Sequence, residues 1–278
     1  MSISPQKVSE LEARAKAIRI DIVKMLEKAG SGHTAGSLGM ADVFTTLYFY
    51  SLNHKPENPQ WPDRDRLILS NGHICPVLYA AMAHSGYFDI SVLYTLRSFN
   101  SPLQGHPHRE FLPALETSSG PLGSGLSQAV GMALADRIDN GRESNKAFFC
   151  LMGDGETNEG QIWEAAMLAS KHSLGNLICI VDRNNIQIDG HTQDIMPLEP
   201  YREKWESFGF HVLDINGHNI EEIADAIDQG RAVFQKPTLI IAHTIASKGV
   251  SEWERKYKWH GEAPNAQEAQ MAIAELEK

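Results

Sequence analysis

Short apolar runs alternate along the chain with segments in which apolar residues recur at helical spacing. Uninterrupted apolar runs are typical of strands that helices cover on both faces of a parallel sheet. Strands are predicted at residues 66–70, 147–152, 177–181, 210–215 and 238–242. Helices are predicted at residues 9–29, 40–52, 73–84, 126–138, 158–170, 219–230 and 266–277. This alternation predicts an α/β fold with three α/β/α layers and a mainly parallel sheet.

Glycine and polar residues mark where several of these elements begin or end. Gly30 follows the first helix as its stop, and Asn219 is placed to cap the start of a later one. Residues 100–125 are instead rich in Pro, Gly, Ser and His and have little periodicity. A long irregular segment inside a compact domain is usually functional or mobile.

The composition narrows the class of protein. With 278 residues, of which 42% are hydrophobic, the chain can bury a substantial core, and we interpret residues 1–278 as a single domain. A net charge of −10 with scattered basic residues argues against nucleic-acid binding. No apolar run suits a signal peptide or a membrane span, so we expect a cytoplasmic protein without membrane contact. Cys75, Cys150 and Cys179 lack metal or redox spacing and are expected to be reduced.

Polar residues follow two neighbouring predicted strands. Residues 153–156 (Gly-Asp-Gly-Glu) come after one strand, and Asn184 and Asn185 come after the next. Because parallel strands end at the same edge of a sheet, Asp154 and Asn184 are expected to lie close together. Carboxylate, amide and main-chain oxygens suit Mg²⁺ or Ca²⁺, and the two glycines let the backbone approach a phosphate. Gly-Asp-Gly alone is a common turn, so the asparagine pair is what favours a metal–diphosphate site.

Four of the 12 histidines stand where a strand or helix meets a glycine-flanked loop. They are His33, His73, His106 and His260. A single surface histidine has no special meaning. Imidazoles at loop ends beside a metal–diphosphate site, however, can donate to phosphate oxygens or bind substrate hydroxyls.

The residues around these histidines form short motifs in a particular order. The motifs are residues 31–36 (Ser-Gly-His-Thr-Ala-Gly), 69–73 (Leu-Ser-Asn-Gly-His), 105–107 (Gly-His-Pro), 120–125 (Gly-Pro-Leu-Gly-Ser-Gly) and 259–261 (Trp-His-Gly). Together with residues 153–185, which are similar to the thiamine diphosphate-binding motif, they resemble the transketolase family. The resemblance extends over nearly the whole chain and implies the thiamine diphosphate-binding fold.

The resemblance implies thiamine diphosphate and Mg²⁺, with Ca²⁺ or Mn²⁺ able to replace the magnesium. The metal would bind the side chains of Asp154 and Asn184 and the main-chain carbonyl of Ile186. The residues implied to bind the cofactor are His73, Gly120, Pro121, Leu122, Gly153, Asp154, Gly155, Glu156, Asn184 and His260.

The resemblance also implies which side chains face the sugar. His33, His106 and His260 would be the catalytic residues that hydrogen-bond sugar oxygens and move protons. Glu159 and Glu164 match acidic residues near the subunit contact of transketolases, although glutamates on a helix are more often plain surface.

Four residues depart from the family pattern on the sugar side. Thr34 and Gln104 stand where proline is common, and His108 and Arg109 follow a proline where an acidic residue is expected. These departures leave the cofactor assignment intact and the identity of the sugar open.

A complete transketolase carries three domains, and this chain accounts for the first of them. The resemblance therefore implies the N-terminal subunit of a split transketolase, with the pyrimidine-binding and C-terminal domains on a partner chain. Such a pair would assemble as α2β2 and transfer a two-carbon ketol unit from a ketose phosphate to an aldose phosphate through a carbanion and enamine of the cofactor. Alone, the chain is expected to be inactive.

Three other interpretations remain at this point. The split enzyme could be specialised for another sugar, such as a sulfosugar or a branched sugar phosphate. It could be another thiamine diphosphate enzyme, such as a deoxyxylulose phosphate synthase-like protein, whereas the motifs at residues 105–107 and 120–125 disfavour the α chain of a 2-oxoacid dehydrogenase. It could also be a non-catalytic binding protein, against which the intact polar residues argue.

Overall fold

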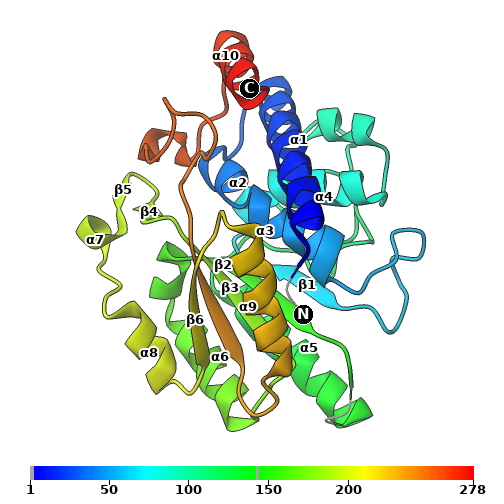
Figure 1. Cartoon of the computed structure of the whole chain (residues 1–278), viewed down its shortest axis with the longest axis vertical. Coiled ribbons are helices and arrows are strands. Elements are labelled where there is room, and N and C mark those ends of the chain that lie inside the picture. Colours follow the sequence, from blue (N-terminus) through cyan, green and yellow to red (C-terminus); the bar gives the residue numbers. More distant parts are fainter. Residues whose placement is uncertain (1–2, 142–143) are drawn as a thin grey trace.

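A five-stranded parallel sheet runs through the middle of the molecule (Figure 1). The computed structural model describes residues 3–141 and 144–278. The sheet has the order β1-β2-β3-β7-β6, and every neighbouring pair is parallel. The strands are β1 (Arg66–Leu69), β2 (Phe148–Gly153), β3 (Leu177–Arg183), β6 (His211–Asn216) and β7 (Thr238–His243). The apolar runs predict all five.

Helices cover both faces of the sheet. Alternate residues of a strand point to opposite faces, so Phe149 and Leu151 pack in one core, and Phe148 and Cys150 pack in another. Around the first core lie α1 (Pro5–Ala29), α2 (Ala35–Gly39), α3 (Ala41–Thr46), α4 (Cys75–Ser85), α9 (Ile220–Ala232) and α10 (Ala266–Leu276). Around the second lie α5 (Ser124–Asn140), α6 (Gly160–Lys171) and α8 (Tyr201–Ser207). The three-layer prediction is confirmed.

The predicted helix at residues 40–52 is present in altered form. It begins as α3 and ends in a π-helical turn, Leu47–Ser51. The stop and the cap are as predicted: Gly30 has φ 62°, and the Asn219 side chain accepts hydrogen bonds from the backbone N–H groups of Glu221 and Glu222.

Several short elements were not predicted. They are α2, α7 (Thr192–Ile195), α8 and a two-stranded antiparallel hairpin of β4 (Ile186–Gln187) and β5 (Gly190–His191). Short 3₁₀ turns add Gly72–Ile74, Ile90–Thr95, Gly155–Asn158 and Tyr257–His260. Each of these elements is short, so its residues show no clear helical or alternating period in the sequence.

The register of the sheet brings the ends of three strands level. Gly153 pairs with Asp182, and Asp182 pairs with Ala242. The segments that follow β2 and β3 therefore leave the sheet side by side, which is where open α/β sheets bind ligands. At one end of the molecule α10 lies beside α1 (Figure 1). None of the helices in the described part of the chain has the length and apolar character needed to cross a membrane.

Candidate active site

Asp154 is buried at the turn that follows β2. Its side chain is satisfied by protein groups on both oxygens: Oδ1 accepts from the N–H of Gly155 at 2.7 Å, and Oδ2 accepts from the N–H of Asn185 at 2.8 Å. Arg183 also donates to Oδ2 at 3.0 Å. Burial raises the pKa of Asp154, and Arg183 and the two N–H groups partly offset that effect.

Asn184 directly precedes Asn185, whose N–H donates to Asp154, so the two predicted residues lie at the same edge of the sheet. Asn184 Oδ1 accepts from the N–H of Ile186 at 2.9 Å, and its Nδ2 donates to Asp182 at 2.8 Å. Burial raises the pKa of Asp182 to about 7, and a hydrogen bond from the Thr244 hydroxyl opposes the rise. The Asn184 oxygen is thus turned toward the loop that also carries the Ile186 carbonyl.

The donor set at this edge suits a hard divalent cation. In residues 3–141 and 144–278 no three His, Cys, Asp or Glu side chains form a metal cluster; the predicted set uses only one such side chain, with amide and main-chain oxygens besides. Four buried polar atoms around the same edge have no hydrogen-bond partner among the described residues. They are His33 Nδ1, Asn71 Oδ1, Ser119 Oγ and Gln187 Oε1. Unpaired buried polar atoms are costly, so these four are available to hydrogen-bond a bound polar group.

Glu156 accepts hydrogen bonds from three separate segments of the chain. One oxygen accepts from the Ser70 hydroxyl and from the N–H of Gly123 at 2.6 Å, and the other accepts from the N–H of Gly153 at 3.0 Å. Burial raises its pKa, although these hydrogen bonds act in the opposite direction. The predicted direct contact of Glu156 with a cofactor stays a prediction, whereas its contacts with the protein fix the position of the Gly153 turn.

The glycine-rich loop at residues 120–125 lies over that carboxylate. Gly123 has φ 82°, a left-handed conformation that side chains disfavour. Gly120 has no atom within 4 Å of where a Cβ would stand, and Leu122 is 37% exposed. Gly120, Pro121 and Leu122 are therefore open to a ligand, and their contact with a cofactor stays a prediction.

The structure brings all four predicted histidines together. The ring centroid of His33 lies 4.9 Å from that of His73, 5.5 Å from that of His260 and 6.4 Å from that of His106. The His73 and His260 rings are 5.2 Å apart. Loops from four separate parts of the chain thus form one imidazole cluster.

The cluster is held in the neutral form. Burial, followed by the nearby His260, Arg97 and His106, lowers the pKa of His33 to about 4. Burial lowers the pKa of His73 well below its usual value. Burial also lowers the pKa of His260. For His106, partial burial and Arg97 lower the pKa. Neutral imidazoles can both donate and accept a hydrogen bond, which a sugar hydroxyl or carbonyl requires.

Two of the departures from the family pattern donate hydrogen bonds to main-chain carbonyls. Thr34 is buried and donates to the carbonyl of Glu262 at 2.6 Å, which ties the first histidine loop to the loop after His260. Gln104 donates to the carbonyl of Ser101 at 2.7 Å. His108 is half-buried and Arg109 is exposed.

Glu159 and Glu164 are exposed at the start of α6 and along its surface. Their place near a subunit contact stays a prediction.

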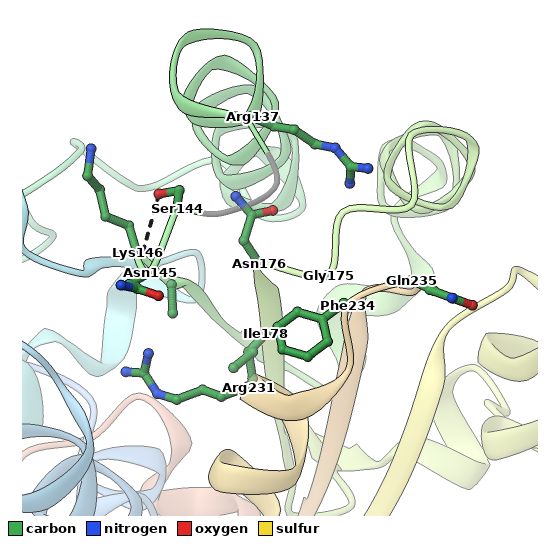
Figure 2. Close-up of a pocket in the computed structure, with 12 residues that line it drawn as sticks. Arg137, Ser144, Asn145, Lys146, Gly175, Asn176, Ile178, Arg231, Phe234 and Gln235 are labelled. Carbon is green, nitrogen blue, oxygen red and sulfur yellow. Dashed lines mark hydrogen bonds between the residues drawn. The ribbon is translucent and has the colours of Figure 1, made fainter.

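A cavity of about 390 Å³ lies at the opposite edge of the sheet, before β2, β3 and β7. Figure 2 shows that the side chains of Arg137, Lys146 and Arg231 point away from one another around it. Lys146 is 3.1 Å from Asp136, and Arg231 is 2.6 Å from Asp65. The cavity does not contain the predicted residues and lacks converging charges.

Several residues at the site were not predicted. Asp182 and Arg183 lie inside the segment that carries the metal–diphosphate motif, but an Asp-Arg pair at a strand end has no distinctive spacing. Asn71 and Gln187 stand out in the sequence only as neighbours of predicted residues. Asp182 could have been identified from the sequence, because a polar residue there directly follows the apolar run at residues 177–181.

Comparison with known proteins identifies the family. The family model described as "Transketolase, thiamine diphosphate binding domain" matches residues 11–276. The chain belongs to the transketolase family. The predicted transketolase family and the predicted α/β fold are therefore confirmed.

Relatives of two lengths match the chain. It is 43% identical over 276 residues to the 6-deoxy-6-sulfo-D-fructose transketolase subunit SqwG of Clostridium sp. (strain MSTE9), with 99% of each chain covered. It is 39% identical to an apulose-4-phosphate transketolase subunit of Phocaeicola vulgatus, covering 97% of this chain and 95% of that protein. Human transketolase is 34% identical, and the chain spans 42% of it.

Solved structures agree with these matches. Transketolase from Campylobacter jejuni superposes with a TM-score of 0.91 at 38% identity, covering 97% of this chain and 43% of that one. The chain therefore spans about two fifths of the solved transketolases and nearly the whole length of the transketolase subunits.

Proposed function

We propose that the chain is the thiamine diphosphate-binding subunit of a two-chain transketolase. The observation that supports this most is the arrangement at the carboxyl edge of the sheet, where Asp154 follows β2, Asn184 follows β3, and His73, which belongs to a cluster of four histidines, follows β1. Asp154 and Asn184 are suited to a metal–diphosphate, and the histidine cluster is suited to a sugar. A protein that only binds the cofactor would not need the histidine cluster.

In this proposal Mg²⁺ is held by the side chains of Asp154 and Asn184 and by the carbonyl of Ile186. Ca²⁺ or Mn²⁺ would serve as well, because the ligands are hard oxygens. Gly155 meets the diphosphate through its N–H, and His73 and His260 donate to phosphate oxygens. The remaining cofactor contacts are the two loops at residues 120–122 and 153–156.

When bound, thiamine diphosphate supplies a nucleophilic carbon that carries the two-carbon unit between sugars. The chain's own contribution is at His33, His106 and His260. As neutral imidazoles they hydrogen-bond the oxygens of the sugar and take up or release the proton of a hydroxyl as its carbon–carbon bond breaks or forms.

The partner is proposed to be a chain that carries the pyrimidine-binding and C-terminal domains, and residues 1–278 to be one diphosphate-binding domain. Support comes from relatives of the same length that are named as subunits. We infer an α2β2 assembly in the cytoplasm, with Glu159 and Glu164 near the contact between subunits.

The sugar is a separate part of the proposal. Ketose and aldose phosphates of the pentose phosphate pathway are the starting assumption. The names of two relatives refer to a sulfosugar and to apulose 4-phosphate, and these favour a specialised sugar as the second candidate. In this proposal the departures from the family pattern lie on the side of the site that faces the sugar. They are at Thr34, Gln104, His108 and Arg109.

A donor screen tests this function. The chain, its partner, Mg²⁺ and thiamine diphosphate are supplied with a pentulose phosphate, a sulfofructose, a branched ketose phosphate or pyruvate. Ketol transfer from one of the three sugars is expected. Consumption of pyruvate alone would favour a deoxyxylulose phosphate synthase-like enzyme and contradict the proposal.

A further inference from the structure

A buried arginine shares the carboxylate of Asp154. Arg183 Nη1 lies 3.0 Å from Asp154 Oδ2, and the two side chains are 7% and 2% exposed. The N–H of Asn185 donates to the same oxygen at 2.8 Å. A carboxylate oxygen accepts about two hydrogen bonds, so Oδ2 is fully used. Oδ1 accepts only from Gly155 among the described residues and keeps a free lone pair.

Arg183 is also held by groups other than Asp154. Nη1 donates to Thr192 Oγ1 at 3.1 Å, and Nη2 donates to Glu199 Oε1 at 2.8 Å. The guanidinium carbon lies 5.3 Å from the centre of the Tyr201 ring. These contacts join it to α7 and α8, so its position does not depend on the carboxylate alone.

We propose that Arg183 is a positioning residue that acts as a built-in counter-cation for Asp154 in the metal-free chain. It keeps the carboxylate in place with Oδ2 occupied, and leaves Oδ1 for the metal. This rests on the proposed function, in which Asp154 binds the metal.

The physical reason is the cost of an isolated buried charge. A carboxylate removed from water is strongly destabilising unless a cation or several donors compensate it. Arg183 supplies that cation before any metal is bound. A divalent ion and Arg183 then repel each other across the same carboxylate, so each weakens the stabilising effect of the other. Without Arg183, folding should become more dependent on the metal.

Thermal unfolding of the full chain tests the inference. The wild type, Arg183→Met and the control Arg202→Met are compared with and without Mg²⁺ plus thiamine diphosphate. Arg202 is a suitable control because it is an arginine on α8 with ion pairs to Glu206 and Asp214 and a 44% exposed side chain. Arg183→Met is expected to lower the metal-free Tm by roughly 5–10 °C, whereas the control changes it by about 2 °C or less.

The rise in Tm on adding Mg²⁺ plus thiamine diphosphate is the measurement that tests the inference. Mg²⁺ plus thiamine diphosphate should raise the Tm of Arg183→Met by several degrees more than that of the wild type. Arg183→Lys, which keeps the charge, should recover more than half of the lost Tm. An equal or smaller response of Arg183→Met would overturn the inference, and so would failure of that variant to fold even with metal and cofactor.

A double-mutant cycle without metal separates this inference from the proposed function. Asp154→Asn removes the charge that Arg183 compensates, so the double variant should lose less Tm than the sum of the two single losses. Additive losses would refute the pairing. If the wild type shows no response to metal and cofactor even with the partner subunit present, the proposed function fails, and the cycle still reports on the pair.

Discussion

The rings of His33 and His73 lie 4.9 Å apart between centroids and are inclined at 52°. They come from different loops, one after α1 and the other after β1. Two imidazolium ions at this distance would repel each other, and burial, with His33, His260 and His106 as further causes, lowers the pKa of His73 well below its usual value. Before a substrate reacts, the rings are therefore neutral near pH 7 and can act as hydrogen-bond donors and acceptors.

Stability should depend on pH through this cluster. The pKa of His33 is about 4 in the folded chain against a usual value of 6.5. Between these values the unfolded chain binds a proton that the folded chain does not, so stability is complete above pH 6.5 and falls as the pH drops toward 4. Urea unfolding at a series of pH values should give a shallower loss for His33→Gln than for the wild type.

His172→Gln, at the end of α6 and outside the cluster, provides the control. Its pH profile should run parallel to that of the wild type. If the His33→Gln profile were also parallel, burial of a neutral His33 would not be the cause of the acid sensitivity.

Glu156→Gln should destabilise the chain. A glutamine has one acceptor oxygen and one NH2 group, which would meet either the Gly123 or the Gly153 N–H that now donates to Glu156. A buried unsatisfied donor costs about 1–3 kcal/mol, and that loss is expected in the free energy of unfolding from denaturant titration. Glu203→Gln, an exposed glutamate on α8, should change it by less than about 0.5 kcal/mol. Equal effects of the two changes would show that the Glu156 contacts do not stabilise the turn.

Two glycines of α5 should respond in opposite directions to alanine. A Cβ at Gly125 would stand 2.5 Å from the Cβ of Ser70 and 2.7 Å from its Cα, so Gly125→Ala must displace the loop that Glu156 binds. Gly131 has open space, and Gly131→Ala should stabilise the helix by about 0.5–1 kcal/mol. Denaturant unfolding of both variants measures the difference. A stabilised Gly125→Ala would mean that the close approach to Ser70 is not needed.

A substitution at Asn184 removes a proposed metal ligand, whereas one at Ile186 does not, because Ile186 is proposed to bind through its main chain. Asn184→Ala deletes a side-chain oxygen and should weaken the binding of thiamine diphosphate in the presence of Mg²⁺ by roughly 10–100-fold. Ile186→Val keeps the main-chain carbonyl, so binding should change by less than about 2-fold. Titration calorimetry on the two variants measures both affinities. Equal weakening would indicate a packing effect and not metal coordination.

The strands and the edge on which the site lies could be predicted because their signals are local. Uninterrupted apolar runs identify β2 and β3, and parallel pairing then places Asp154 beside Asn184. By contrast, α8 has only two buried apolar residues, Tyr201 and Trp205, in seven positions. Two such positions do not distinguish a helix from a loop.

The network under the site could not be predicted for a different reason. In the sequence Glu156 looks like part of a phosphate-binding turn, and only the folded chain reveals that Ser70 and Gly123 are its partners. These contacts join residues distant in sequence, and a single sequence carries no signal for them. The same holds for the pairing of Arg183 with Asp154.

The central claim is that this chain holds the metal–diphosphate part of an active site that only a partner completes. Its most direct test is a ketol-transfer assay with Mg²⁺ and thiamine diphosphate on the purified chain, on a chain with transketolase pyrimidine-binding and C-terminal domains from the same organism, and on the two mixed. We predict turnover only in the mixture. Turnover by the chain alone, or none in the mixture with any sugar of the donor screen, would contradict the account.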